Sequence, residues 1–271
     1  MESEFLKKIE EKIKEQKIKP LKDEERELFW VNRTNSQKGD SSLYNCEKCN
    51  SKGFIAFLND KGKYDTRMCD CYNKRENRKK LRQLGLLKYI DQNNSFDDYI
   101  AKETWQILTK EKAIDYVNNG GDKWFFIGGN VGTGKTKLCT IIISQLLDKY
   151  NKTIGFLSWD SEYKELVFKD NLNVKINYYK QVDILYIDDF FRLSTISEIK
   201  DMERDLAKSI IDYRYRNNLI TIISSELNYN EIENLDVAIA SRIYEMAGYG
   251  KYILSQKRDA NRNVRKNIEL I

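Results

Sequence analysis

Eight consecutive residues near the middle of the chain have the types and spacing needed to hold phosphate groups. They fit the pattern G-x-x-x-x-G-K-[ST] in full, and they are Gly129, Asn130, Val131, Gly132, Thr133, Gly134, Lys135 and Thr136. Glycines let the backbone curl until its N–H groups point at phosphate oxygens. The helix expected after the loop adds its positive N-terminal end. Lys135 is placed to contact the β- and γ-phosphates, and the Thr136 hydroxyl to bind Mg²⁺. Lys137 completes the expected nucleotide-binding set.

An apolar run that ends in two carboxylates supplies the second half of such a site. It begins at Asp183 and ends at Asp188 and Asp189. Asp188 can hold Mg²⁺ through water, and Asp189 can orient and deprotonate an attacking water molecule. A strand ending in Asp-Asp is common by itself. Together with a complete phosphate loop, it predicts an enzyme that binds ATP and Mg²⁺ and hydrolyses ATP.

Four cysteines form two close pairs, Cys46-x-x-Cys49 and Cys69-x-Cys71. Four thiolates suit a tetrahedral Zn²⁺ site of the structural kind, which leaves no position open for water. Lys52-Gly53 fits the tight turn that follows the first pair in such sites. Disulfides are the alternative, but they are unexpected in a cytosolic protein. The fifth cysteine, Cys139, is expected to be a buried apolar residue.

The chain contains no histidine. This excludes Ser-His-Asp and Cys-His triads, H-E-x-x-H metalloproteases and every metal site that uses imidazole. Any metal must therefore be held by thiolates or oxygen ligands. A general base must be a carboxylate, Lys, Tyr or Cys.

Composition indicates an ordinary globular protein with two basic segments. The 271 residues are 41% hydrophobic and 33% charged, a length that suggests about two domains. The net charge is +5, with +6 in residues 74–88 and +3 in residues 257–271. These segments either contact a polyanion or form solvated helix faces. No apolar signal core follows Met1, and the apolar stretch 138–147 is too short to span a bilayer, so we expect a cytoplasmic protein.

Strand-like apolar runs alternate with helical runs from about residue 97 onward. This order predicts an α/β fold with a parallel sheet flanked by helices. The predicted helices lie near residues 135–150, 160–169, 198–217 and 235–247. The predicted strands are Lys123–Ile127, Thr153–Trp159, Val182–Ile187, Leu219–Ser224 and Tyr252–Leu254.

The segment before the cysteines is predicted to be helical and rich in charge. Phe5, Ile9 and Ile13 form one apolar stripe, and a second helix is expected over Asp23–Val31, where Leu28, Phe29 and Trp30 are apolar. The segment either binds a partner or packs on its own neighbour. A helix over residues 74–88 and a polar linker over 91–98 are expected next.

At this point the chain resembles a family, the AAA+ ATPases of the DnaC/DnaI helicase-loader group. The resemblance covers residues 44–267 and includes the cysteine cluster, the run from Trp124 to Phe191, and the segments 221–227 and 240–246. Many members are encoded by phages or other mobile elements, and several carry a similar cysteine module. The resemblance implies an AAA+ domain without a helical lid domain. It divides the chain into a helical helicase-interaction segment (1–42), a four-cysteine zinc module (43–75), a basic helix and linker (76–96) and the ATPase domain (97–271).

The function that the resemblance implies is ATP-dependent loading of a DnaB-type replicative helicase onto single-stranded DNA at the initiation of replication. The protein would act in the bacterial cytoplasm, that of the host if it is phage-encoded. One alternative is a transposition helper ATPase that resembles the IstB group, although the zinc module argues against it. A second alternative is an adaptor that binds nucleotide with little hydrolysis.

The resemblance also assigns roles to single residues. Arg242 matches an arginine that reaches the γ-phosphate of a neighbouring subunit, which requires head-to-tail assembly into a ring or helix; a structural ion pair is the alternative. Glu226 occupies a position where the family usually has a polar residue facing the attacking water, so turnover is slow or Ser225 substitutes. Near the C-terminus, either Arg262 or Arg265 contacts nucleotide.

The resemblance places a helix that contacts DNA near residues 160–170, where Lys164, Phe168 and Lys169 offer charge and one ring for stacking. An ordinary amphipathic helix is the alternative. The basic segment 74–88 could instead bind DNA or an acidic surface of the helicase.

Overall fold

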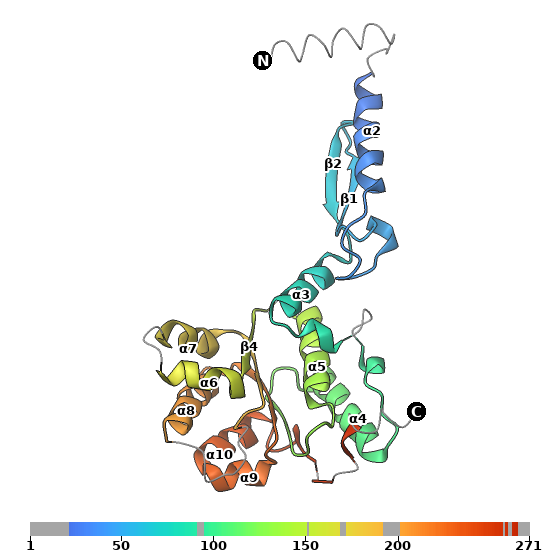
Figure 1. The fold of residues 1–271 in the computed structure, drawn as a ribbon. Helices are drawn as coiled ribbons and strands as arrows, with labels where there is room; N and C mark the ends of the chain where they lie inside the picture. Colours follow the sequence, from blue (N-terminus) through green and yellow to red (C-terminus); the bar gives the residue numbers. More distant parts are fainter. Residues whose placement is uncertain are drawn as a thin grey trace. The chain divides into compact units, whose positions relative to one another are not determined.

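The computed structural model describes residues 22–90, 95–150, 152–168, 172–191, 201–256, 258–259 and 262–264 (Figure 1). The apolar stripe predicted at Phe5, Ile9 and Ile13 lies outside these residues. The chain divides into two compact units between Arg75 and Glu76. The first unit has a small buried cluster around the cysteines, and the second has a large apolar core.

In the first unit, a helix packs against a two-stranded hairpin. Helix α2 (Asp23–Ser36) is followed by the 3-10 turn η1 (Glu47–Cys49) and by the antiparallel strands β1 (Phe54–Leu58) and β2 (Tyr64–Met68). The Asn35 side chain bonds the backbone of Ala56 in the way that a neighbouring strand would. Its Nδ2 donates to the Ala56 C=O at 2.9 Å, and its Oδ1 accepts the Ala56 N–H at 3.0 Å. Glu27 accepts the Tyr64 N–H at 2.9 Å. These bonds attach α2 to both strands.

Helix α2 continues past Val31, where the predicted helix ends, to Ser36. The reason lies in the cysteine-containing turn. Lys52 Nζ donates to carbonyl groups at the end of the helix, at 2.7, 3.0 and 3.1 Å; these belong to Thr34, Asn35 and Gln37. An ammonium group in this position satisfies carbonyls that lack a helical partner and complements the negative end of the helix.

The basic segment 74–88 does not form the single helix that the sequence predicted. Helix α3 covers Tyr72–Gln83, and Gly85 then turns the chain with a φ of +70°. The Leu86 N–H bonds the Leu81 carbonyl at 2.9 Å, which closes the helix end in the usual glycine-dependent way. A 3-10 turn, η2 (Leu87–Tyr89), follows. Both Leu81 and Leu86 are fully buried in the second unit.

The second unit is built on a parallel five-stranded sheet with the order β4-β5-β6-β3-β7 (Figure 1). All five predicted strands are present, with ends that shift by one or two residues. Every residue of β3, β5 and β6 is buried, which explains why these strands read as continuous apolar runs. The strands are β3 (Phe125–Gly128), β4 (Ile154–Ser158), β5 (Ile184–Asp188), β6 (Ile220–Ser225) and β7 (Ile253–Ser255).

Among the described residues of the second unit, the α-helices include all four predicted helical runs and three that were not predicted. The predicted runs correspond to α5 (Lys135–Lys149), α6 (Trp159–Phe168), α8 (Asp201–Arg216) and α10 (Val237–Met246). The additional helices are α4 (Thr104–Asn119), α7 (Leu172–Gln181) and α9 (Tyr229–Leu235). The polar stretch predicted as a linker ends in a 3-10 turn, η3 (Phe96–Asp98), and its residues 91–94 lie outside the described part.

The apolar stretch 138–147 forms most of α5, and its side chains are buried in the core. Within the described ranges, no helix has the length and apolar character needed to cross a membrane. No helical lid domain follows β7 among the residues that the structure describes.

Candidate functional site

The phosphate loop connects strand β3, which lies between β6 and β7, to the start of α5, and its glycines are required by its shape. Gly129, Gly132 and Gly134 have φ values of +112°, +76° and +83°. A Cβ at Gly129 would lie 2.2 Å from the Gln256 carbonyl oxygen, and one at Gly132 would lie 2.1 Å from Asn263 Oδ1. A residue with a side chain would be strained at these positions and would also collide with the segment after β7.

Lys135 is the first residue of α5 and is 7% exposed. Its Nζ donates to the carbonyl oxygens of Gly129 and Asn130 at 2.9 and 2.7 Å. Burial lowers the pKa of Lys135, and the nearby carboxylates of Asp189 and Glu226 oppose this shift. The loop therefore holds a buried cation at the place where phosphate oxygens would replace the two carbonyl partners.

Asp188, the last residue of β5, receives three hydroxyl groups. The Thr136 hydroxyl lies 3.2 Å from Asp188 Oδ1, and the Tyr186 hydroxyl donates to the same oxygen at 2.6 Å. The Ser224 hydroxyl, from β6, also donates to it. Thr136 and Asp188 are thus brought together from separate parts of the chain. Tyr186 and Ser224 were not predicted as site residues, because neither stands at a position that the phosphate loop or the Asp-Asp pair defines.

Two further carboxylates, those of Asp189 and Glu226, line a cavity beside the phosphate loop. Asp189 has a φ of +54°, and its N–H bonds the Ser224 hydroxyl oxygen at 3.3 Å. Ser225, which was expected as a substitute for Glu226, is fully buried, and its hydroxyl donates to the Phe190 carbonyl at 2.6 Å. Ser225 therefore does not line the cavity, whereas the next residue, Glu226, does.

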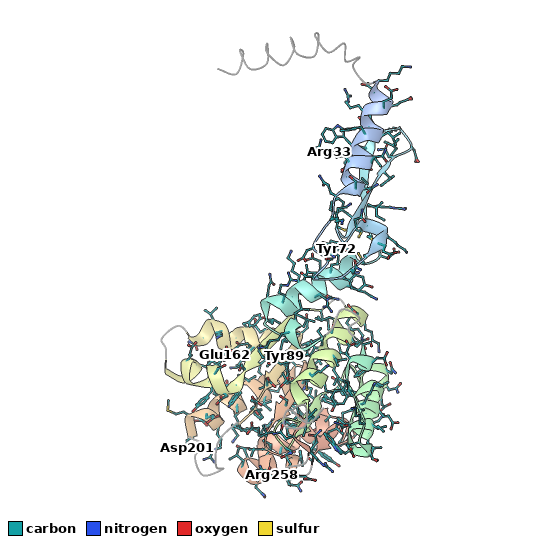
Figure 2. The ribbon with its side chains drawn as sticks, turned by 45° about the vertical axis from the view of Figure 1, so that its right-hand side comes forward. Arg33, Tyr72, Tyr89, Glu162, Asp201 and Arg258 are labelled. Carbon is teal, nitrogen blue, oxygen red and sulfur yellow. The ribbon has the colours of Figure 1, made fainter. Side chains whose placement is uncertain are left out.

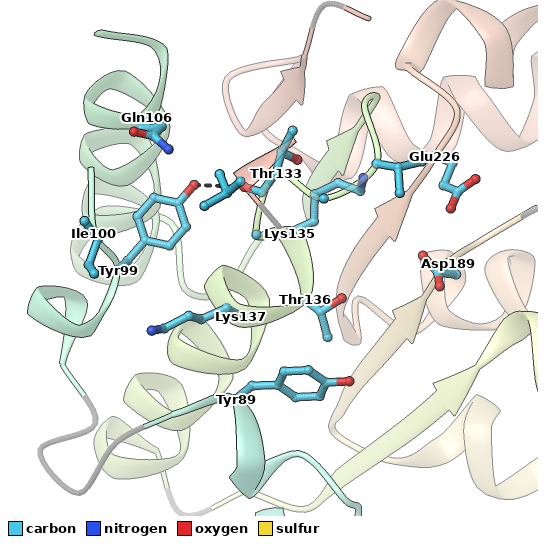
Figure 3. Close-up of a pocket in the computed structure, with 14 residues that line it drawn as sticks. Tyr89, Tyr99, Ile100, Gln106, Thr133, Lys135, Thr136, Lys137, Asp189 and Glu226 are labelled. Atoms are coloured by element: carbon cyan, nitrogen blue, oxygen red, sulfur yellow. Dashed lines mark hydrogen bonds between the residues drawn. The ribbon is translucent and has the colours of Figure 1, made fainter. Parts of the chain in front are cut away.

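The cavity has a volume of about 390 Å³ and two chemically different ends (Figure 3). Lys135, Thr136, Asp189 and Glu226 lie toward one end, and Tyr99, Ile100 and Gln106 toward the other. Tyr99 is 4% exposed, and its hydroxyl donates to the Thr133 carbonyl at 3.3 Å. Among the predicted nucleotide-binding residues, those of the segment 131–137 line the cavity directly.

Arg242 lies on α10 and does not line this cavity. Its Nε is 2.9 Å from Asp212 Oδ1, and its guanidinium group lies 5.6 Å from the centre of the Tyr215 ring. Arg262 lies 5.1 Å from the centre of the Trp105 ring and does not line the cavity either. Arg265 is outside the described residues.

The four cysteine sulfur atoms of the first unit all lie within 4.8 Å of one another. The distances are 3.8 Å from Cys46 to Cys69 and 3.5 Å from Cys49 to Cys71, and all of these thiols are free. A zinc ion about 2.3 Å from four sulfurs requires sulfur–sulfur distances of about 3.8 Å, so the donor set fits this metal. Gly53, with a φ of +89°, directs its N–H at Cys49 Sγ at 3.2 Å. Burial opposes ionisation of Cys49, but this bond and the neighbouring thiols lower its pKa to about 7.

The predicted DNA-contacting groups are only partly described. The side chains of Lys164 and Phe168 and the whole of Lys169 lie outside the described part. In the basic segment, the Arg75 guanidinium donates to the carbonyl oxygens of Tyr44 and Asp40 at 2.6 and 2.9 Å. Arg75 and Arg78 are buried, so they do not belong to a solvated basic face.

A phosphate loop after β3 and an Asp-Asp pair after β5, with β6 between these two strands, define an AAA+ P-loop domain. The chain belongs to the family described as the bacterial DnaA ATPase domain, whose model matches residues 90–248. The AAA+ fold expected from the sequence is therefore confirmed.

Two relatives and one solved structure illustrate this similarity. The phage-like element PBSX protein XkdC of Bacillus subtilis (strain 168) is 27% identical over 224 residues, which cover 77% of this chain and 82% of XkdC. The chromosomal replication initiator protein DnaA of Flavobacterium psychrophilum is 28% identical over 169 residues, 60% of this chain and 34% of that protein. The chain thus spans most of XkdC but about a third of DnaA. The crystal structure of DnaI aligns with a TM-score of 0.49 and 22% identity, covering 64% of this chain and 94% of that one.

Proposed function

We propose that the protein is an ATPase that loads a DnaB-type replicative helicase onto single-stranded DNA when replication is initiated. Membership of the DnaA ATPase domain family supports a nucleotide-dependent role in replication. Similarity to XkdC, a protein of a phage-like element, supports a mobile-element origin and hence action in the cytoplasm of a bacterial host.

The observation that carries the nucleotide part of the proposal is the contact between Thr136 and Asp188 beside the phosphate loop. A hydroxyl and a carboxylate oxygen at this position are the ligand types that Mg²⁺ uses in P-loop sites. Bound there, Mg²⁺ would neutralise part of the phosphate charge. Lys135 would exchange its two carbonyl partners for phosphate oxygens, and Asp189 would orient the attacking water.

A partner surface on the first unit supports the loading part of the proposal. Leu28, Phe29 and Trp30 on α2 are 48%, 46% and 46% exposed. The rings of Phe29 and Trp30 contact each other edge to face, and the guanidinium of Arg33 lies 5.4 Å from the centre of the Trp30 ring. Figure 2 shows the position of Arg33 on α2. Aromatic residues with an adjacent arginine are typical of protein-binding surfaces. We assign the helicase contact to this face and a bracing role to zinc at the four cysteines.

The test is a helicase-loading assay on circular single-stranded DNA with the full chain. Lys135→Ala should abolish ATP-dependent loading, because it removes the buried cation from the phosphate loop. Trp30→Glu should weaken helicase binding about tenfold or more while leaving ATP turnover unchanged. Val174→Glu, at a 79% exposed side chain on α7, is the matched control and should leave both unchanged.

Two results would contradict the proposal. One is wild-type protein that binds no replicative helicase in a pull-down but does bind a transposase. The other is unchanged ATP-dependent loading by the Lys135→Ala variant.

Glu226 favours a second candidate, an adaptor that binds ATP but hydrolyses it little. A carboxylate that lines the cavity together with Asp189 adds negative charge near the place where the γ-phosphate would lie. Single-turnover measurements with and without single-stranded DNA separate the two. A loader should turn over on the time scale of loading, and an adaptor should retain intact ATP.

A further inference from the structure

Gln106 is a buried polar residue whose amide orientation is set by the start of α4. The side chain is 7% exposed, and its Oε1 accepts the N–H groups of Lys102 and Glu103 at 2.8 and 2.9 Å. With the oxygen used at the helix start, the NH₂ group must point the other way. Gln106 lines the cavity at the end away from Asp189, close to Tyr99 (Figure 3).

The NH₂ group of Gln106 has no acceptor among the residues that the structure describes. A carboxamide nitrogen is a donor only. Because Oε1 is held by the backbone and Gln106 lines the cavity, the NH₂ group is a donor open to the cavity. A ligand that fills this end of the cavity and presents an acceptor would replace water as the partner of this donor.

The surroundings of Gln106 suit a flat, largely apolar group. Tyr99 and Ile100 line the same end, and the phosphate loop lies between them and the carboxylates. Val264 also lines the cavity. A nucleotide with its phosphates on Lys135 would place its base here. Adenine combines an apolar face with ring nitrogens that accept hydrogen bonds, N1, N3 and N7.

We propose that Gln106 is a specificity-determining residue that donates a hydrogen bond from Nε2 to a ring nitrogen of the adenine base. This inference rests on ATP binding in the cavity, as proposed above, and adds the group that recognises the base. A purely structural role, as the cap of α4, is the competing explanation.

Gln106→Glu separates the two roles. The carboxylate keeps an oxygen for the N–H groups of Lys102 and Glu103, and negative charge in the first turn of a helix is favourable. The NH₂ donor is lost, and one negative charge is added. We expect ATP binding, measured by calorimetry, to weaken about tenfold or more, while the unfolding temperature stays unchanged or rises.

The new charge could also repel the phosphates, so base analogues provide the decisive comparison. We would measure binding of 1-deaza-, 3-deaza- and 7-deaza-ATP, each of which replaces one ring nitrogen by C–H. Wild-type protein should bind one of the three about tenfold more weakly than ATP. In the Gln106→Glu variant that ratio should fall to one or below, because phosphate repulsion acts equally on ATP and on the analogue and therefore cancels.

Gln83→Glu, at an exposed position near the end of α3, adds the same charge outside the cavity and should leave every ratio at its wild-type value. The proposal is overturned if wild-type protein binds all three analogues as tightly as ATP, or if the ratios are the same in Gln106→Glu and wild type. Failure of the proposed function gives a different result, since wild-type protein would then not bind ATP itself.

Discussion

Three hydroxyl groups converge on Asp188 from three places: Thr136 at the start of α5, Tyr186 within β5 and Ser224 on β6. Tyr186 and Ser224 have fixed backbone positions in buried strands, and Thr136 lies in the first turn of α5. The carboxylate is therefore held in one orientation before any ligand arrives. Such preorganisation lowers the cost of assembling a site when nucleotide binds.

The carboxylate of Glu226 leads to a prediction about affinity. Glu226→Gln removes one negative charge from the cavity and keeps the side-chain length. ATP should then bind on the order of fivefold more tightly, because a like-charge repulsion with the phosphates is lost. Equilibrium titration with a fluorescent ATP analogue measures the change. Glu233→Gln, at an exposed position on α9, is the matched control. Weaker binding by Glu226→Gln would show instead that the carboxylate helps to hold a ligand.

Tyr99 leads to a prediction about pH. Burial raises the pKa of its hydroxyl to about 12. An unfolded tyrosine ionises near pH 10, whereas the folded one keeps its proton to about pH 12. The folded state therefore binds more protons between these values, and its stability falls as pH rises. Below pH 10 the group has no effect.

Between pH 10 and 12, the free energy of unfolding should fall less steeply with pH in Tyr99→Phe than in wild type. We expect the two slopes to differ by about 1.4 kcal/mol per pH unit. Urea unfolding at a series of pH values measures the slope. Tyr249→Phe alters a ring that is 73% exposed and is the matched control. Equal slopes for wild type and Tyr99→Phe would rule out the linkage.

At the scale of elements, the cysteine cluster and α2 are physically connected. Lys52 lies between Cys49 and Gly53 and also bonds the last carbonyl groups of α2. Purified protein should contain about one zinc per chain, and a strong chelator should unfold both the cysteine-containing turn and α2. Metal analysis and far-ultraviolet circular dichroism measure the two effects.

Lys52→Met tests the connection while leaving the cysteines in place. It should lower the stability of α2 by about 0.5–2 kcal/mol, the usual cost of losing a helix cap, without reducing the zinc content. Protein that lacks zinc, with all four thiols freely titratable in the native state, would contradict the metal assignment.

The centre of the sheet was predictable because its three inner strands are buried on both faces. β3, β5 and β6 are buried throughout, so hydrophobicity alone marks them. Helix α4 was missed because polar Gln106 and Thr109 are among its buried residues, which hides the apolar periodicity. Helix α9 has only seven residues, too few for a periodic pattern.

The candidate site also contains one part that the sequence predicts and one part that it does not. The phosphate loop is one continuous motif, and its geometry follows from local sequence. Gln106 and Ser224 join the site through tertiary contacts between elements that are far apart in the sequence. Arg214 shows the same limit, since a charged residue in a charged helix is fully buried and donates to backbone carbonyls of Tyr179, Val182 and Ile220.

At the scale of the whole molecule, Arg242 bears on assembly. It forms an ion pair with Asp212 and does not line the cavity of its own chain. We expect Arg242→Ala to bind ATP normally but to hydrolyse it at least about a thousandfold more slowly, the effect of losing an arginine supplied by a neighbour. Phosphate-release assays measure the rate.

Mixing two inactive variants tests whether the arginine acts between chains. Arg242→Ala and Lys135→Ala together should regain part of the activity, because some interfaces would pair an intact phosphate loop with an intact arginine. Full activity of Arg242→Ala alone would show that the residue is structural. Absence of rescue on mixing would favour action within one chain.

The end of β6 connects the two halves of the site. The Ser225 carbonyl accepts the Gly129 N–H at 3.2 Å, and the Ser224 carbonyl accepts the Phe190 N–H at 2.9 Å. If the phosphate loop moves when it binds phosphate, a shift of Gly129 also disturbs the end of β6, because Ser225 and Ser224 bond Gly129 and Phe190. The two amides should therefore open to solvent as one cooperative unit and exchange their hydrogens at matched rates. Nucleotide bound at the phosphate loop would then also slow hydrogen exchange at the Phe190 amide, at the other end of this connection.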